Sequence, residues 1–207
     1  MKFPIQRARR QTRTILTALV AAASIALIAA CATEEVDPAL PVLTELGEFI
    51  VSDDCADLEH GHLDTMTITV SHGETEHPVT AEIADKPSER AQGLMCRDSI
   101  PQGTGMIFLY EEPRTTGFWM LNTYSEIDVL YLDRSRKIVD KITMSPCLRE
   151  NLNDDNWQVK CATESADYVP RGEYTSVLEL PAGWLGSIGV DDTNINQMTL
   201  DWQPVAN

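Results

Sequence analysis

Asp128 is the acidic residue of this sequence whose surroundings most favour chemistry. It stands between Ile127 and Val129, so a strand here would bury its carboxyl group among apolar side chains. Burial raises the pKa of a carboxyl group, and such a group can serve as a general acid or base. The sequence contains no Gly-x-Ser-x-Gly, His-Glu-x-x-His, phosphate-binding-loop or dinucleotide-binding motif. Asp128 is therefore a weak catalytic candidate, and the sequence favours a protein without enzymatic activity.

Cysteines supply a second kind of chemistry. Apart from the cysteine of the N-terminal segment, an even number remains: Cys55, Cys96, Cys147 and Cys161. In an exported protein this favours disulfides. Cys147 and Cys161 flank an Asn- and Asp-rich stretch, residues 150–156, with no evident structure, and closing a loop of about 15 residues contributes roughly 3 kcal/mol. We predict this bridge and, for the other pair, Cys55–Cys96. The alternative for Cys96 is a reactive thiol, which no Cys-x-x-Cys spacing supports.

Histidine and methionine raise the question of a metal. All four histidines fall within 18 residues, as His60, His62, His72 and His77. A surface zinc or copper site is conceivable there, but solvated loop histidines are the favoured interpretation. Met95, Met106, Met120 and Met144 are of the type that binds soft metals, although methionine fills hydrophobic cores far more often. A metal-handling protein is thus a weaker alternative, and we predict no metal and no cofactor.

Alternation of apolar and polar residues predicts the elements that position these groups. It indicates strands over 66–70, 79–83, 105–110, 116–121, 126–132, 137–144, 174–180 and 197–202. Asp85 as N-cap with Pro87 in the first turn predicts a short helix over 87–95, and residues 181–188 can form one or two helical turns. Residues 133–136 read as a hairpin turn. Many short strands with one or two short helices predict an α+β fold, mainly antiparallel, with a small barrel-like sheet.

Several blocks of the sequence resemble a known family. Residues 84–97 (ADKPSERAQGLMCR) are similar to the signature of a bacterial and archaeal family, domain of unknown function 192. The resemblance continues at 105–108 (GMIF), 118–123 (FWMLNT), 127–128 (ID), 144–147 (MSPC) and 178–183 (LELPAG). Cys96 departs from it where an aromatic residue is common, and Glu126 where proline is common. Members are often small secreted or lipid-anchored proteins without an agreed activity, so the resemblance implies location more than chemistry.

The polar and aromatic members of these blocks are the candidate ligand-binding residues: Arg97, Trp119, Asn122, Thr123 and Asp128. At the mouth of a small barrel, an arginine would offer a planar set of donors and an asparagine both a donor and an acceptor. The alternative is structural. In that case Asn122 and Thr123 make turn hydrogen bonds, Arg97 neutralises buried Asp128, and Trp119 belongs to the core.

The N-terminus predicts export and lipidation. A basic stretch to Arg13 precedes an apolar run over 15–30, which is short for a membrane-spanning helix and typical of a signal peptide. The run ends in LIAAC, which resembles a bacterial lipobox, so Cys31 would carry the acyl chains that attach the protein to the membrane. Ala32, rather than Asp, follows Cys31, which favours the outer membrane by analogy with Gram-negative sorting.

Charge excludes one class of partner. The chain has 16 Lys and Arg against 32 Asp and Glu, a net charge of −16. Because five of the bases and none of the acids lie in the first 30 residues, the remaining 177 residues carry 11 bases and 32 acids, or −21. Such a field repels a phosphate backbone, which argues against nucleic-acid binding.

Together these features predict three segments: a lipoprotein signal peptide over 1–30, an acidic tether over 31–61 and a single β-rich domain over 62–207. We expect a monomeric, lipid-anchored envelope protein, facing the periplasm, whose domain binds a small ligand or a protein partner without catalysis. The alternative function is an enzyme on an envelope substrate, with Asp128 as acid or base and Arg97 binding an anion.

Overall fold

The computed structural model describes residues 45–56, 58 and 61–203, all of which belong to one compact unit. The predicted signal peptide, Cys31, most of the tether and His60 lie outside the described residues. Within the described part, no helix has the length and apolar character needed to cross a membrane.

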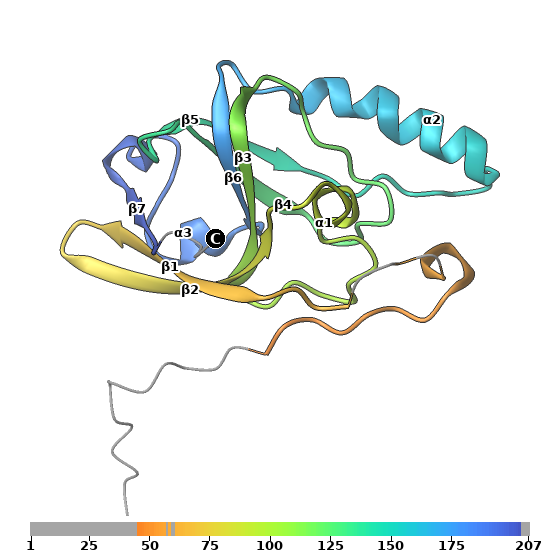
Figure 1. Cartoon of the computed structure of the whole chain (residues 1–207), viewed down its shortest axis with the longest axis horizontal. Helices are drawn as coiled ribbons and strands as arrows, with labels where there is room; N and C mark the ends of the chain where they lie inside the picture. Colours follow the sequence, from red (N-terminus) through yellow and green to blue (C-terminus); the bar gives the residue numbers. More distant parts are fainter. Residues whose placement is uncertain (1–44, 57, 59–60, 204–207) are drawn as a thin grey trace, which may run out of the picture. The chain divides into compact units, whose positions relative to one another are not determined.

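A seven-stranded, mostly antiparallel sheet forms the fold, in the order β5-β4-β6-β3-β2-β1-β7 (Figure 1). Only β2 and β3 pair in parallel. The strands are β1 (Thr65–His72), β2 (Thr75–Ala84), β3 (Thr104–Arg114), β4 (Ile127–Leu132), β5 (Ile138–Met144), β6 (Tyr174–Pro181) and β7 (Thr199–Asp201). The α-helices are α1 (Pro87–Gln92), α2 (Asp154–Glu164) and α3 (Trp184–Ser187), and short 3-10 helices span Asp53–Cys55, Ser165–Tyr168 and Ile195–Gln197. The sheet curls into a half-barrel, which confirms the predicted α+β class.

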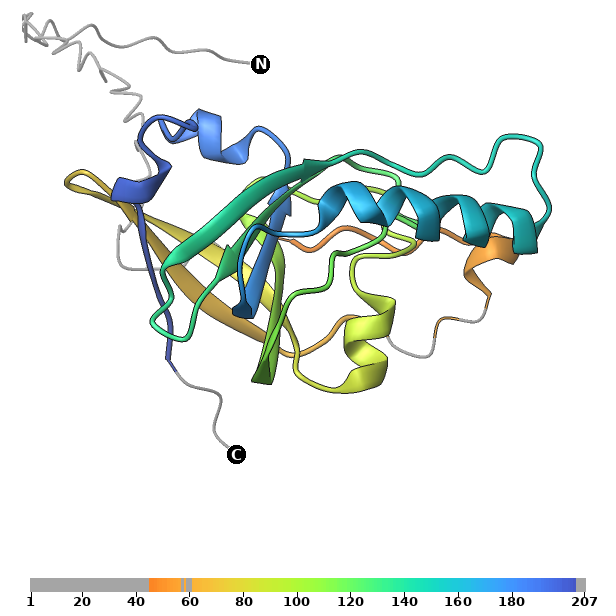
Figure 2. The ribbon, with the colours of Figure 1, turned by 90° about the horizontal axis from the view of Figure 1, so that it is seen from above.

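Each face of the curled sheet carries its own hydrophobic core. Alternate residues of β6 show the division, since Leu178 and Leu180 belong to one cluster while Val177 belongs to the other. The first cluster is closed by residues 184–202, and the second is covered by residues 94–121 and by Trp157 and Cys161 of α2. Figure 2 shows α1 and α2 on one side of the sheet, with α3 on another. Because both faces are covered at its centre, β4 is buried at every position, whereas β1 keeps the alternating pattern, with Ile68 and Val70 buried between less buried neighbours.

Two predicted elements differ from the structure. Residues 116–121 do not form the predicted strand and lie outside the sheet. Their apolar character reflects packing onto the sheet, since the Phe118 ring meets the Phe108 ring edge-on with centroids 4.9 Å apart. The stretch 150–156 is not a plain loop, because α2 begins inside it at Asp154, with the Asn153 side chain accepting a hydrogen bond from the Asn156 amide. In addition, the N-cap of α1 is Lys86 rather than Asp85, and Glu89 Oε2 accepts a hydrogen bond from the Lys86 amide.

Both predicted disulfides are present, Cys55–Cys96 and Cys147–Cys161. The first joins the described start of the chain to the domain, where Phe49 also pairs with Arg97 as an isolated β-bridge. The Ile50 amide donates to the Cys96 carbonyl at 2.9 Å. Part of the segment predicted as a tether therefore lies against the domain.

Candidate functional site

Arg97 lies in a buried ion pair. Its side chain is 3% exposed, and Nη2 lies 2.8 Å from Glu82 Oε1 on β2. Phe49 covers the guanidinium, whose carbon lies 4.0 Å from the ring centroid, and His62 also contacts it. Burial lowers the pKa of Arg97, and the charge of Glu82 partly offsets that change. The adjacent cavity measures only about 10 Å³, so there is no room for a ligand larger than a water molecule.

The three candidates of block 118–123 lie in and beside a turn. Asn122 has a positive φ of 52°, and its Nδ2 donates to the Asp54 carbonyl at 2.8 Å. Thr123 donates to the Leu121 carbonyl at 3.2 Å. Trp119 is 40% exposed at the surface rather than part of the core. Thr123 thus makes the turn bond of the structural alternative. The Asn122 side chain instead joins this turn to the distant segment that contains Asp54.

Asp128 ties three elements together. On β4, its Oδ1 accepts hydrogen bonds from Thr143 at 2.6 Å and lies 2.9 Å from Lys141 Nζ, both on β5. Its Oδ2 accepts from the Gly183 amide at 3.0 Å, which fixes the start of α3. These groups line a cavity of about 310 Å³. The Asp128 carboxylate is satisfied by these contacts.

The five predicted residues are therefore not brought together. Arg97 pairs with Glu82 rather than with Asp128, and these two candidates line separate cavities. A site that combines Asp128 with Arg97, as the enzyme alternative requires, does not occur in the described structure.

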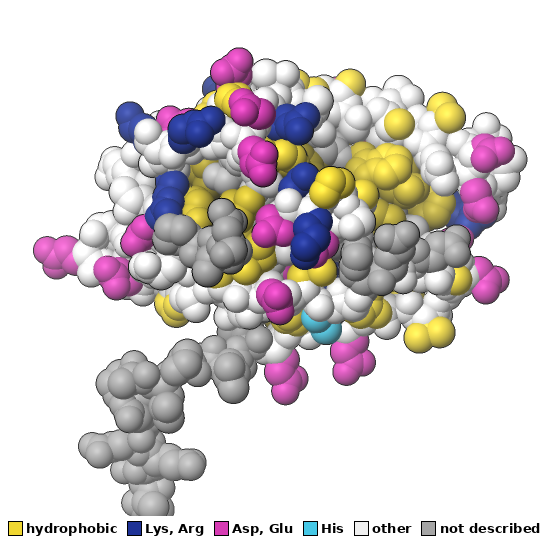
Figure 3. Space-filling view, viewed as in Figure 1, with side chains coloured by type: hydrophobic (Ala, Val, Ile, Leu, Met, Phe, Trp, Pro, Cys, Tyr) yellow, Lys and Arg dark blue, Asp and Glu magenta, His cyan; other side chains and the backbone are white. Residues whose placement is uncertain are grey.

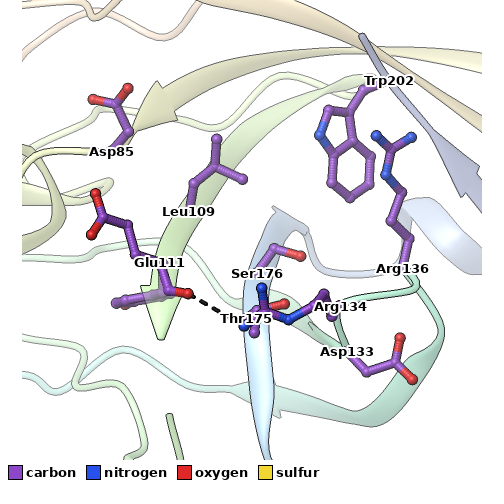
Figure 4. A pocket seen from close by; sticks show the side chains of 10 residues that line it. Asp85, Leu109, Glu111, Asp133, Arg134, Arg136, Thr175, Ser176 and Trp202 are labelled. Atoms are coloured by element: carbon purple, nitrogen blue, oxygen red, sulfur yellow. Dashed lines mark hydrogen bonds between the residues drawn. The ribbon is translucent and has the colours of Figure 1, made fainter. Parts of the chain in front are cut away.

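Another cavity lies at the mouth of the half-barrel, between the ends of β3 and β6 and the β4–β5 turn. It measures about 390 Å³, and we call it the barrel-mouth cavity. It is lined by Asp85, Leu109, Tyr110, Glu111, Asp133, Arg134, Arg136, Thr175, Ser176 and Trp202. Figure 4 shows these side chains around the open space, and Figure 3 shows acidic and basic side chains intermixed around a hollow with a hydrophobic floor. None of the five candidate residues predicted from the sequence lines this cavity.

Two polar groups that belong to largely buried residues line this cavity without a hydrogen-bond partner in the described structure. Ser176 is 5% exposed and Trp202 is 8% exposed. No described residue accepts or donates a hydrogen bond at Ser176 Oγ or Trp202 Nε1, although both residues line the cavity. Because neither atom bonds to the described part of the chain, both can bond to a ligand in the cavity.

Arg136 lies at the edge of the cavity and contacts Trp202 and Asp201. Its guanidinium carbon lies 4.0 Å from the Trp202 ring centroid, and Nη1 pairs with Asp201 on β7. Its φ is 64°, in the left-handed region that non-glycine residues rarely adopt. The side chain bridges the β4–β5 turn to β7, and on its other side it lines a second cavity of about 550 Å³. Arg136 therefore orients the Trp202 indole from a strained turn.

Sequence reasoning missed these residues because they come from distant segments. One signal was available for Ser176, which shares the alternating row of Leu178 and Leu180 and is thus a hydroxyl at a core-facing position. Glu179, on the opposite row, was missed in the same way. Burial raises its pKa to about 8, and its register partners Met106 and Val129 are fully buried.

The residues considered for metal binding are placed elsewhere. Met106, Met120 and Met144 lie in the core, with Met95 packed against it. His62 contacts Arg97 and Glu82, and the His77 ring meets Trp184 edge-on at 6.4 Å. Among residues 45–56, 58 and 61–203, no group of three or more His, Cys, Asp or Glu side chains is arranged to hold a metal ion.

Two solved structures resemble this chain. A Sinorhizobium meliloti protein, provisionally assigned as a transcription regulator, aligns with a TM-score of 0.54 and 25% identity over 69% of this chain and 97% of its own. A protein of unknown function from Novosphingobium aromaticivorans aligns with a TM-score of 0.50 and 23% identity over 74% of this chain and 99% of its own, which supports the fold alone. No curated protein matches. The profile of one family, described as Uncharacterized ACR, matches residues 68–195, and the chain therefore belongs to the family of domain of unknown function 192.

Proposed function

We propose that this chain is a lipid-anchored protein of the bacterial cell envelope whose domain binds a small polar ligand in the barrel-mouth cavity. The observation that carries the proposal is the pair Ser176 Oγ and Trp202 Nε1. These polar groups belong to largely buried residues and line a cavity of about 390 Å³ without a hydrogen-bond partner in the described chain. Cavities of this size suit small ligands, and a few polar groups in them fix orientation.

We favour binding without catalysis because the buried charged side chains are paired within the fold or lie outside the barrel-mouth cavity. Asp128 accepts bonds from β5 and α3, and Arg97 is paired with Glu82. Glu179 is buried among apolar neighbours and lines none of the cavities described above. None of these charges is therefore presented to a substrate in the barrel mouth.

Nucleic acid is not the partner we propose, although one structural neighbour is provisionally assigned as a transcription regulator. A chain with 16 bases against 32 acids lacks the positive surface that phosphate binding needs.

The binding proposal is tested by thermal shift and calorimetry with a library of amino acids, sugars, nucleosides and organic acids. A ligand should raise the Tm of the wild-type domain. Trp202→Phe keeps the ring under Arg136 but removes the N–H, and Ser176→Ala removes the hydroxyl, so both should weaken binding. Ser99→Ala, which changes an exposed hydroxyl bonded to Asp98, should bind as the wild type does. Unchanged affinity in both cavity variants, or no binding by any compound, would refute the proposal.

The anchor is tested separately with Cys31→Ser. Processing at the predicted lipobox should leave mature wild-type protein that begins at acylated Cys31 and sediments with membranes. The variant should lose the lipid mass and move to the soluble fraction, since acyl chains provide the attachment. Identical intact masses and fractionation for both proteins would exclude lipidation at this residue.

A further inference from the structure

The donors of the barrel-mouth cavity suit an anionic group. Trp202 Nε1 can only donate, and the Ser176 hydroxyl can donate as well. Arg134 adds a guanidinium that has no ion pair in the described part of the chain, since its Nη2 donates only to the Glu111 carbonyl at 3.4 Å. Arg134, Arg136 and Lys137, in one turn, are three of the 11 Lys and Arg that follow residue 30. Asp133 belongs to the same turn and also lines the cavity, but its Oδ1 accepts hydrogen bonds from the Ser135 and Lys137 amides. The three basic residues therefore leave the turn with a net positive charge on a strongly acidic chain.

Arg134 and Arg136 have different tasks. The charge of Arg136 is balanced by Asp201, and its guanidinium is stacked on Trp202. Arg136 is thus a positioning residue for the indole. Arg134 retains an unpaired charge and a planar fork of donors, which matches a carboxylate or a phosphate.

The opposite side of the cavity is acidic. Figure 4 shows Asp85 and Glu111 across from Arg136 and Trp202. Among the described residues, the Asp85 carboxylate has an ion pair only with Lys86, whose Nζ lies 4.0 Å away and whose side chain is largely exposed, and Glu111 has none. Arg90 also lies beside Asp85, but its guanidinium donates to the Asp85 and Leu109 carbonyls. A purely anionic ligand would be repelled from this side, whereas an ammonium group would be attracted to it.

From this separation of charge we propose that the ligand is a small zwitterion, with its anionic group at Trp202, Ser176 and Arg134 and its ammonium group toward Asp85 and Glu111. The inference rests on the proposed function. A volume of about 390 Å³ accommodates a molecule of amino-acid size, and Leu109 offers an apolar contact for its side chain. Free amino acids and phosphoethanolamine headgroups share this chemistry.

Calorimetry on the wild-type domain tests the charge requirement. The probes are the twenty common L-amino acids and phosphoethanolamine, and for the tightest probe two analogues follow, one with the amine acetylated and one without the anionic group. Loss of either charge should weaken binding at least about tenfold, because each removes a charge-assisted hydrogen bond. If an amino acid binds more tightly than phosphoethanolamine, the ligand is a free amino acid, and the reverse order indicates a phosphoethanolamine headgroup.

Variants assign each charge to its side of the cavity. Arg134→Gln should weaken the zwitterion at least about tenfold but leave the affinity for the analogue without the anionic group unchanged. Glu111→Gln should reduce the preference for the free amine over its acetylated analogue. Arg171→Gln and Glu112→Gln make the same changes at exposed positions outside the cavity and should bind as the wild type does.

The failures of the two proposals are distinguishable. Tight binding of an uncharged compound that Trp202→Phe weakens would overturn the zwitterion and keep the binding site. Equal affinity for the zwitterion and its acetylated analogue would also overturn it. Absence of binding by every compound in either panel would overturn both proposals.

Discussion

The guanidinium of Arg97 lies 2.8 Å from the carboxylate of Glu82, and both side chains are at most 3% exposed. The Leu63 amide donates to the same carboxylate at 2.7 Å, and Phe49 covers the guanidinium. The pair therefore joins β2, the chain after α1 and the described start of the domain. These contacts give Arg97 a structural role in holding the fold together.

Removing one partner of this pair should cost more than removing both. Arg97→Met leaves the Glu82 charge buried and should lower the free energy of unfolding by about 3–5 kcal/mol. The double variant Glu82→Leu with Arg97→Met buries no unpaired charge and should lose less than the sum of the single changes. Urea denaturation of the four proteins measures the coupling. Strictly additive losses would show that the two charges do not depend on each other.

Asp128 should prove structural as well. Asp128→Ala removes the contacts to Thr143, Lys141 and the Gly183 amide, and we expect a loss of about 2–4 kcal/mol, reduced because Lys141 is partly exposed. The Gly183 amide should exchange its hydrogen faster, because its acceptor is gone. Asp167→Ala, at an exposed position, serves as the control. Wild-type stability and exchange in Asp128→Ala would contradict this role.

Most strands could be predicted because alternation reports burial directly, and the exceptions have physical causes. Phe118 is partly buried against Phe108 and Tyr131 without belonging to a strand, so the apolar residues around it resemble a strand pattern. Helix α2 buries only Trp157 and Cys161, and Val159 is 65% exposed, so its sequence lacks an apolar stripe. Asn153 with two following aspartates was the available sign of its start.

The residues of the proposed binding site were harder to predict than the strands. Ser176 and Trp202 are far apart in the sequence and meet only because β7 returns beside β1 while the β4–β5 turn reaches it through Arg136. The family blocks, by contrast, contain residues that hold the fold, as Arg97 and Asp128 do. A polar residue in a core-facing row, such as Ser176, was the more informative signal.

The Cys147–Cys161 disulfide should stabilise the domain because it closes a loop and so lowers the conformational entropy of the unfolded chain. The separation is 14 residues, and the chain-entropy estimate for such a loop is about 3 kcal/mol. Cys147→Ser with Cys161→Ser should lose about that amount in urea denaturation. Adding a reducing agent should destabilise the wild type by more than the double variant, because the variant has only the Cys55–Cys96 disulfide left to lose. Equal stability of the two oxidised proteins would contradict the estimate.

Glu179 should make the domain less stable as the pH rises. Burial raises its pKa from 4.5 to about 8, so between these values the unfolded chain ionises Glu179 while the folded chain keeps it protonated. The unfolded state then binds fewer protons, and the free energy of unfolding should fall by up to about 1.4 kcal/mol per pH unit over this window. Below pH 4.5 and above pH 8 this contribution is constant. The carboxyl group lies on β6 between Met106 and Val129, which offer it no charge or hydrogen bond.

Glu179→Gln should therefore remove this fall in the free energy of unfolding between pH 4.5 and pH 8, rather than change stability equally at every pH. We expect the variant to gain stability over the wild type progressively from pH 5 to pH 8 in urea denaturation, because glutamine cannot ionise and has nearly the same shape. Glu112→Gln, at an exposed position of β3, changes the same formal charge and should run parallel to the wild type. Parallel curves for Glu179→Gln and the wild type would mean that Glu179 is ionised in the folded protein at neutral pH. The buried face of β6 would then have to supply a compensating group.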